Sequence, residues 1–214
     1  MRYELKMPFD EALLNQIIKT LYASPLGIQE IFHERKVNNV YFDTLQFDDY
    51  SANVDGLYHR SKFRIRWYGS EDHFYPILEE KIKEGDLGYK RTVEFDDFLT
   101  QEDILSRYQQ LMLNDFALAQ RFHHRHPSLI NSYMRRYFLS QNRKIRLTLD
   151  KDIHYAHPVH HHLSIPVPHL MILEVKFEQE DYLTVQHLLQ SLNLRFDKNS
   201  KYVNGIALIK NASI

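Results

Sequence analysis

The sequence contains no cysteine in 214 residues. This absence excludes disulfide frameworks, thiolate zinc sites and cysteine nucleophiles, and it fits a reducing compartment. No run of about 18 apolar residues occurs, so we expect no membrane-spanning segment. The N-terminus, MRYELKMPFD, has no apolar signal-peptide core. The net charge of −1 gives no basic excess, so the totals do not favour a nucleic-acid partner. These absences predict a soluble cytoplasmic protein.

Glycine is also scarce, at 6 residues. None of them forms a GxGxxG or GxxxxGK[ST] loop, so neither a Rossmann nor a P-loop nucleotide site is expected. Aromatic residues are plentiful instead, with 14 Tyr and 13 Phe. Hydrophobic and charged fractions of 43% and 26% are typical of a globular chain with a substantial core. If this protein binds phosphate, side chains must do so, and we treat residues 1–214 as a single domain.

Hydrophobic periodicity predicts both helices and strands. Helices are expected over residues 10–23, 101–125, 181–192 and 200–209, with Asp10 able to cap the first and Pro127 marking the end of the second. Strands are expected over residues 2–7, 36–43, 60–68, 73–83, 88–96, 132–140, 143–150 and 170–178. Strands joined by short connections and interrupted by helices indicate an α+β fold with an antiparallel sheet or barrel.

Two histidine-rich segments raise the question of a metal site. His160, His161 and His162 lie in a proline-bounded stretch, and adjacent side chains point in different directions, whereas tetrahedral sites need spaced ligands. We therefore expect a solvated loop there. The HHRH segment at 123–126 is interpreted as a polar helix end, where His and Arg suit the C-terminal dipole.

Several predicted strands separate charged from apolar residues completely. In KFRIRW at 62–67, Lys62, Arg64 and Arg66 share one face, because residues i and i+2 of a strand project together. The same separation appears in KIRLTLD at 144–150, and again where Glu174 and Lys176 oppose an apolar face. Each strand alone fits an ordinary amphipathic sheet with a solvated charged face.

The recurrence of these charged faces favours a second interpretation. If the strands close into a barrel, the cations line its interior, and their mutual repulsion calls for a polyanion. Arg and Lys both suit phosphate, and a carboxylate among them would hold Mg²⁺ or Mn²⁺. An open sheet with solvated charged faces and a closed barrel with charged faces inside and helices packed outside therefore both stay open on the residues alone.

An ordered set of short motifs resembles a known family. The motifs are RYELK at 2–6, VYFDT at 40–44, KFRIRWY at 62–68, LEEK at 78–81, GYKR at 88–91, SYMRRYF at 132–138, KIRLTLD at 144–150, ILEVK at 172–176 and DKNSKY at 197–202. Each is weak alone, but in this order they resemble the catalytic domain of the vacuolar transporter chaperone (VTC) family. That family makes polyphosphate and belongs to the triphosphate tunnel metalloenzyme (CYTH-like) superfamily. The resemblance covers nearly the whole chain.

The resemblance implies a closed antiparallel β-barrel, a tunnel of about eight strands with helices packed outside, and on this basis we predict that fold. The tunnel would bind ATP, triphosphate or polyphosphate with Mn²⁺ or Mg²⁺ and transfer the ATP γ-phosphate onto a polyphosphate chain. By position, the catalytic cations would be Arg64, Arg66, Lys81, Arg135, Arg146 and Lys201. Substrate-binding residues would be Lys6, Lys90, Tyr133, Lys176, Lys198 and Ser200, and the metal ligands would be Glu174 and Glu4. Tyr133 and its neighbour Tyr137 equally suit ordinary sheet aromatics.

Two departures from the family pattern keep alternatives open. Related hydrolases open with Glu-x-Glu-x-Lys, whereas Arg2 stands at the first glutamate position here, which favours the VTC branch and removes a metal carboxylate. The sensing domain and membrane helices of the eukaryotic polymerases have no counterpart in this chain, so product export would need a membrane partner. The alternatives are a triphosphatase on the same tunnel and a non-catalytic polyanion-binding module.

Overall fold

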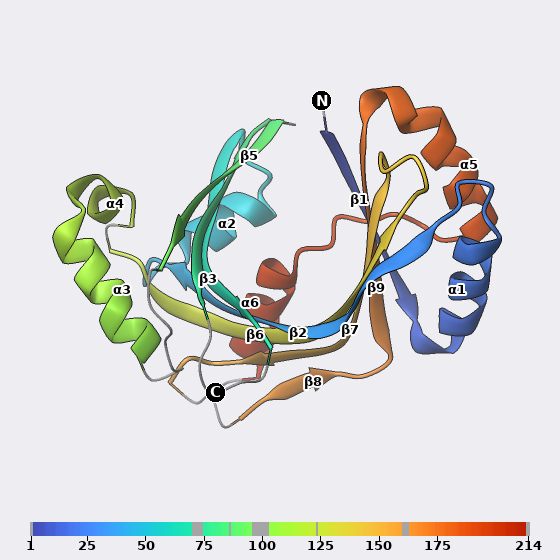
Figure 1. The fold of residues 1–214 in the computed structure, drawn as a ribbon. Coiled ribbons are helices and arrows are strands. Elements are labelled where there is room, and N and C mark those ends of the chain that lie inside the picture. The colour runs from blue at the N-terminus through green and yellow to red at the C-terminus, as the bar shows by residue number, and fades with distance from the viewer. Residues whose placement is uncertain are drawn as a thin grey trace. The chain divides into compact units, whose positions relative to one another are not determined.

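The computed structural model describes residues 2–69, 75–85, 87–95, 103–122, 124–159 and 163–212. The chain is α+β, as predicted, and most of it forms an antiparallel sheet (Figure 1). The strands are β1 (Arg2–Asp10), β2 (Gln29–Asp43), β3 (His59–Tyr68), β4 (Ile77–Glu84), β5 (Leu87–Glu94), β6 (His126–Leu139), β7 (Arg146–Ala156), β8 (Ile165–Val167) and β9 (Leu170–Glu178). The helices are α1 (Leu14–Ala23), α2 (Asp48–Val54), α3 (Asp103–Asn114), α4 (Phe116–Arg121), α5 (Tyr182–Leu192) and α6 (Lys201–Asn211).

The sheet is open, so the prediction of a closed barrel is wrong. Its nine strands follow the order β1-β9-β7-β6-β2-β3-β4-β5, and β8 pairs with β7 off this path. A barrel needs a ladder between its first and last strands. In the described residues β1 pairs with β9 and β5 with β4, and β1 and β5 are the two ends of the order.

The contacts within the chain divide it into two compact units. Unit 1 comprises Met1–Lys36, Tyr133–His154 and Pro166–Ser200, and unit 2 comprises Val37–Ser132, Tyr155–Ile165 and Lys201–Ile214. Strands β2, β6 and β7 contribute residues to both. A single functional domain over 1–214 stays a prediction, and each unit is described by itself.

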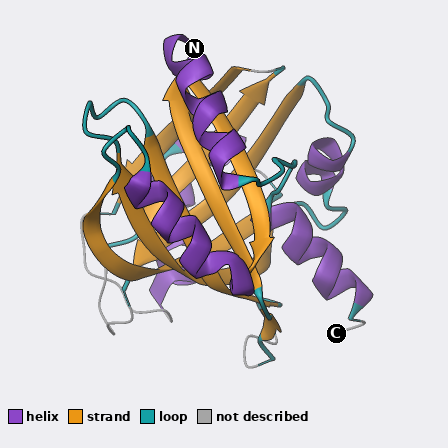
Figure 2. Cartoon of the chain, turned by 90° about the vertical axis from the view of Figure 1, so that its right-hand side faces the viewer, coloured by secondary structure: helices purple, strands orange, loops and turns teal. Residues whose placement is uncertain are grey.

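In unit 1, helices α1 and α5 cover the apolar face of β1, β9 and β7. Figure 2 views the chain from their side, and both helices lie in front of the strands. Strand residues such as Met7, Leu173 and Leu149 pack against helix residues such as Leu21 and Val185. Because side chains alternate along a strand, the charged residues of these strands lie on the opposite face. Asp10 caps the turn before α1 as predicted, accepting from Ala12 N at 2.9 Å.

In unit 2, helices α3 and α4 cover the apolar face of β2, β3 and β4 (Figure 1). The ring of Phe42 stacks on Tyr108 of α3 with centroids 4.4 Å apart, and Phe63 packs edge-on against Phe122 after α4. Helix α6 packs on the other face, where the ring of Tyr202 lies 5.0 Å from that of Tyr41. Helices therefore lie on both faces of this part of the sheet, whereas only the apolar face was expected to carry them.

Helix α6 packs unusually close to its neighbours in unit 2. A Cβ atom built on Gly205 would lie 2.6 Å from both Leu129 and Tyr155 side-chain carbons. Tyr202, one turn earlier, is buried and donates its hydroxyl hydrogen bond to Asp43. Asp43 also accepts from the backbone N–H groups of Asp49 and Tyr50, so one buried carboxylate connects β2, α2 and α6.

The helix predicted over 101–125 is two helices. Asp115 ends the periodic run and accepts from Leu118 N at 2.9 Å, which makes it the N-cap of α4. Pro127 does not mark a helix end, because α4 ends at Arg121 and β6 begins at His126 and contains Pro127. Arg125 of the HHRH segment does donate to the carbonyl oxygen of Arg121 at 2.8 Å, as expected of a basic residue at a helix C-terminus. Residues 101, 102 and 123 lie outside the described residues, as do the ends of the strands predicted over 73–83 and 88–96. The loop predicted at His160–His162 lies outside them too.

Helix α2, strand β8 and parts of three longer strands were not predicted. The missed parts are the first half of β2, residues 126–131 of β6 and residues 151–156 of β7. Exposure explains the omission in β2, since QEIFHER has no apolar face to bury and gives no period-2 alternation. Helix α2 has only seven residues, too few for a helical period to appear.

Candidate functional site

Two cross-strand rows of side chains lie on the charged face of unit 1. The registers of β1, β9 and β7 place Lys6, Glu174 and Thr148 in the first row and Glu4, Lys176 and Arg146 in the second. Alternation in each strand puts both rows on one face. The predicted substrate and metal residues of these strands are therefore brought together.

The two lysines and two glutamates form a ring of ion pairs. Lys176 Nζ lies 2.6 Å from Glu174 Oε1 and 3.7 Å from Glu4 Oε2, and Lys6 Nζ lies 3.1 Å from Glu4 Oε1 and 3.8 Å from Glu174 Oε2. Burial, which leaves the Glu174 side chain 8% exposed, opposes its ionisation. Lys176, Lys6 and Arg135 outweigh burial and hold the pKa of Glu174 well below its ordinary value. Glu174 is therefore a carboxylate at neutral pH.

Arg135 on β6 is held by a residue that sequence reasoning did not select. Its Nε and Nη2 donate to the two oxygens of Asp150 at 2.5 and 2.7 Å, and Asp150 is fully buried. Burial disfavours the cation, but Asp150 outweighs it and raises the pKa of Arg135 well above its ordinary value. The guanidinium carbon of Arg135 also lies 5.1 Å from the ring centroid of buried Tyr133, which is a cation–π contact that further stabilises its position. Tyr137 accepts from Arg35 Nε at 3.0 Å.

The segment before α6 is attached to unit 1 at the first row. Asp197 N donates to the carbonyl oxygen of Lys6 at 2.8 Å. Lys198 follows and is exposed, whereas Asn199 has a buried Oδ1 that lacks a hydrogen-bond partner among the described residues. Ser200 is half-buried at the end of this segment, and Lys201 begins α6 in unit 2.

Unit 2 carries a second charged face with more cations. The registers of β3, β4 and β5 align Lys62, Lys81 and Lys90 in one row. The next rows on the same face are Tyr41, Arg64, Glu79 and Thr92, then Asn39, Arg66, Ile77 and Glu94. Three lysines side by side concentrate positive charge on this face, and an anion is the kind of ligand that complements it.

Glu79 is the carboxylate at the centre of these cations. Its Oε2 accepts from Arg64 Nε at 2.6 Å, and its Oε1 accepts from Lys90 Nζ at 2.6 Å. Burial raises its pKa, but Arg64, Arg66 and Lys90 outweigh burial and lower the pKa to about 2. Glu79 therefore holds Arg64 and Lys90 in fixed positions.

Arg66 and Tyr41 complete the cation cluster of unit 2. Arg66 is 8% exposed, and its Nε donates to Asn39 Oδ1 at 2.8 Å. Tyr41 accepts from Arg64 Nη1 at 3.2 Å. Burial would raise the pKa of Tyr41, but Arg64, Arg66 and Lys201 lower it. Because Tyr202 packs on Tyr41, the Lys201 end of α6 is fixed beside this cluster.

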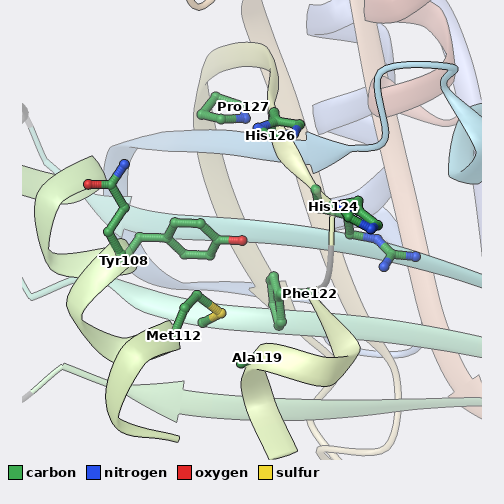
Figure 3. A pocket seen from close by; sticks show the side chains of 9 residues that line it. Tyr108, Met112, Ala119, Phe122, His124, His126 and Pro127 are labelled. Atoms are coloured by element: carbon green, nitrogen blue, oxygen red, sulfur yellow. The ribbon is translucent and has the colours of Figure 1, made fainter. Parts of the chain in front are cut away.

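A pocket of about 380 Å³ in unit 2 lies elsewhere (Figure 3). Tyr108, Met112 and Phe122 line it together with His124 and His126. Tyr108 and Phe122 pack on the apolar face of β2 and β3, so this pocket is separated from the cations of unit 2 by the sheet. It carries none of the predicted site residues.

The structure adds residues that sequence reasoning did not select. They are Asn39, Tyr41, Lys62, Glu79 and Asp150. All stand inside predicted strands or at their ends, and alternation places Lys62 on the charged face, but only the cross-strand register shows what each contacts. Within the ranges that the structure describes, no three His, Asp or Glu side chains gather as a metal site. The functional roles of all these residues stay predictions.

Similarity to solved structures shows the fold. PH1819 from Pyrococcus horikoshii OT3 matches with a TM-score of 0.58 at 17% identity, over 98% of this chain and 99% of that one. A protein from Vibrio parahaemolyticus, provisionally assigned as an adenylate cyclase, matches with a TM-score of 0.53 at 12% identity, over 93% and 94% of the two chains. No curated protein sequence matches this chain.

Each helix of the described residues is too short or too polar to cross a bilayer. The sequence profile of the VTC domain matches residues 2–210. The two charged faces lie on the strands that carry the motifs of that family. On the extent of this match, the chain belongs to the VTC domain family and has a CYTH-like fold.

Proposed function

We propose that this protein is a metal-dependent phosphotransferase that moves the γ-phosphate of ATP onto a polyphosphate chain. The observation that carries the proposal is the cation face of unit 2, where Lys62, Lys81 and Lys90 stand side by side across three strands. Lys90 pairs with Glu79, but the rows of this face hold more cations than carboxylates, and phosphate chains carry the charge density that complements such a face. Membership of the VTC family supports this choice of anion.

The arginines of unit 2 suit the phosphate-clamping role. Glu79 and Asn39 hold Arg64 and Arg66, so these guanidinium groups lose little freedom on binding. Lys81, Lys90 and Lys201 add point charges. Phosphoryl transfer depends mainly on positioning and charge neutralisation. The acceptor oxygen of a polyphosphate terminus is ionised at neutral pH, so the transfer needs no general base.

The carboxylates of unit 1 suit a hard divalent cation. Glu174 and Glu4 would hold Mn²⁺ or Mg²⁺, because ionised carboxylates are the ligands these ions prefer. The donor chemistry fits, since Thr148 in the row of Glu174 has a buried hydroxyl oxygen that lacks a partner among the described residues. A bound cation would neutralise charge on the reacting phosphates. Lys6, Lys176 and Arg146 would then bind phosphate oxygens.

The assay that tests the proposal is incubation with ATP and Mn²⁺, followed by separation of the products by length. A ladder of polyphosphate is the expected result. Arg66→Glu and Glu174→Gln are expected to lower the rate at least about 100-fold while the circular dichroism spectrum is retained. Lys144→Glu is the control, because Lys144 lies at an exposed ion pair with Glu180 and should leave the rate unchanged.

Other outcomes of the same assay assign other functions. Release of orthophosphate without a ladder would assign a triphosphatase. Tight binding of tripolyphosphate without turnover would assign a polyanion-binding module. Either result rejects the polymerase proposal.

A further inference from the structure

The hydroxyl of Thr148 is a polar group that the fold leaves unpaired. Its Oγ1 is buried and has no hydrogen-bond partner in the described part of the chain. A buried hydroxyl without a partner costs free energy, and a valine would fill the same space without that cost. The hydroxyl is therefore best explained by a ligand that the chain itself does not supply.

The neighbours of Thr148 select a cation as that ligand. The register places Thr148 directly opposite Glu174, and residues opposite one another in an antiparallel pair have Cβ atoms about 4.5–5.5 Å apart. The carboxylate of Glu174 would repel a phosphate at this position and attract a metal ion. Threonine hydroxyls are established Mg²⁺ ligands at other phosphate sites.

Glu174 has one oxygen better placed for a cation than the other. Oε1 is held at 2.6 Å by Lys176 Nζ, whereas Oε2 lies 3.8 Å from Lys6 Nζ. The looser oxygen is the one that a cation would take with less competition from ammonium groups. Thr148 supplies a neutral oxygen on the next strand of the same row.

We propose that Thr148 Oγ1 is a ligand of the divalent cation bound by Glu174. This inference rests on the proposed function, because that function requires a divalent cation held by Glu174 and Glu4. Thr148 would be a third residue that gives this cation an oxygen ligand. It goes further in making a neutral hydroxyl part of the metal shell, and it explains how a site with few carboxylates holds a divalent ion.

The test is Mn²⁺ binding by the full chain without nucleotide, measured by isothermal titration calorimetry. Thr148→Val is expected to weaken Mn²⁺ binding about tenfold, Thr148→Ala to do the same, and Thr148→Ser to keep it within about twofold. The metal-free Tm of Thr148→Val should equal or exceed that of the wild type, because the unpaired hydroxyl is gone. Thr92→Val, at an exposed threonine on the charged face of unit 2, is the matched control.

The outcomes separate this inference from the function on which it rests. Equal Mn²⁺ affinity in the wild type and both hydroxyl-free variants overturns the Thr148 assignment and leaves the phosphotransferase proposal standing. A loss of tripolyphosphate affinity in EDTA, with Mn²⁺ affinity unchanged, also overturns it and assigns the hydroxyl to phosphate. A wild-type protein that binds no Mn²⁺ overturns the Thr148 assignment, whereas the ladder assay with ATP and Mn²⁺ decides the phosphotransferase proposal separately.

Discussion

At the scale of single residues, buried carboxylates determine how the cations of each unit are held. Glu79 fixes Arg64 and Lys90, and Asp150 fixes Arg135 through a bidentate pair. A guanidinium fixed in this way binds phosphate with little loss of side-chain entropy. The acidic residues are therefore as important to the proposed anion site as the basic ones.

Glu79 should make stability depend on acid pH. Its pKa of about 2 lies below the ordinary value of 4.5, so its contribution is complete above pH 4.5 and is lost as the pH falls from 4.5 towards 2. The free energy of unfolding is measured in urea at pH 7, 4 and 2.5. Between pH 7 and pH 2.5, Glu79→Gln should lose less of it than the wild type, by on the order of 3 kcal/mol. Glu180→Gln, which removes an exposed ion pair, should change this pH dependence of the free energy of unfolding far less. The same loss of unfolding free energy with falling pH in the wild type and in Glu79→Gln would contradict this role.

Lys176 should compete with the metal for Glu174. Its Nζ lies 2.6 Å from Glu174 Oε1, where it occupies one of the carboxylate oxygens. In Lys176→Gln, Mn²⁺ binding without phosphate should therefore tighten several-fold, while tripolyphosphate binding in EDTA weakens. Calorimetric titration of each ligand checks both changes. Weaker binding of Mn²⁺ would mean that Lys176 supports the metal site instead of competing with it.

At the scale of elements, alternation along each strand separates the charged face from the core. Lys90 and Arg91 are neighbours on β5 but lie on opposite faces, since Lys90 pairs with Glu79 and Arg91 with Glu80. This pair offers an internal comparison in which the same strand loses one positive charge on either side.

Lys90→Gln should weaken tripolyphosphate binding about tenfold at low salt, and the difference should shrink in 0.5 M salt because screening reduces the contribution of each charge. Arg91→Gln should leave the affinity within about twofold. Fluorescence or calorimetric titration at both salt concentrations checks this. Equal losses in the two variants would show that only net charge matters.

Sequence reasoning recovered these faces because alternation is local. It placed Lys62, Arg64 and Arg66 together and opposed Glu174 and Lys176 to an apolar face, as the registers confirm. It did not find Glu79 or Asp150 as partners, because pairing across strands depends on register, and register is a long-range property. It also missed the break at Asp115, where a cap interrupts an otherwise continuous helical period.

At the scale of the whole molecule, the α+β class and most elements were predictable from periodicity, but the closure of the sheet was not. Closure depends on whether β1 and β5 pair, and neither strand carries a signal for its partner. The edge strand β5 is exposed along nearly its whole length, yet its sequence alternates like that of a paired strand. A family resemblance supplied the expectation of a closed tunnel, and the strand order shows an open sheet.

Gly205 carries no charge and no side chain, yet the position of α6 depends on it. Leu129 and Tyr155 leave no room for even a methyl group there. An added side chain would displace the helix that begins at Lys201, and the ammonium group would move with it. In a screen that measures turnover alone, Gly205→Ala would then give the same result as a substitution in the proposed active site.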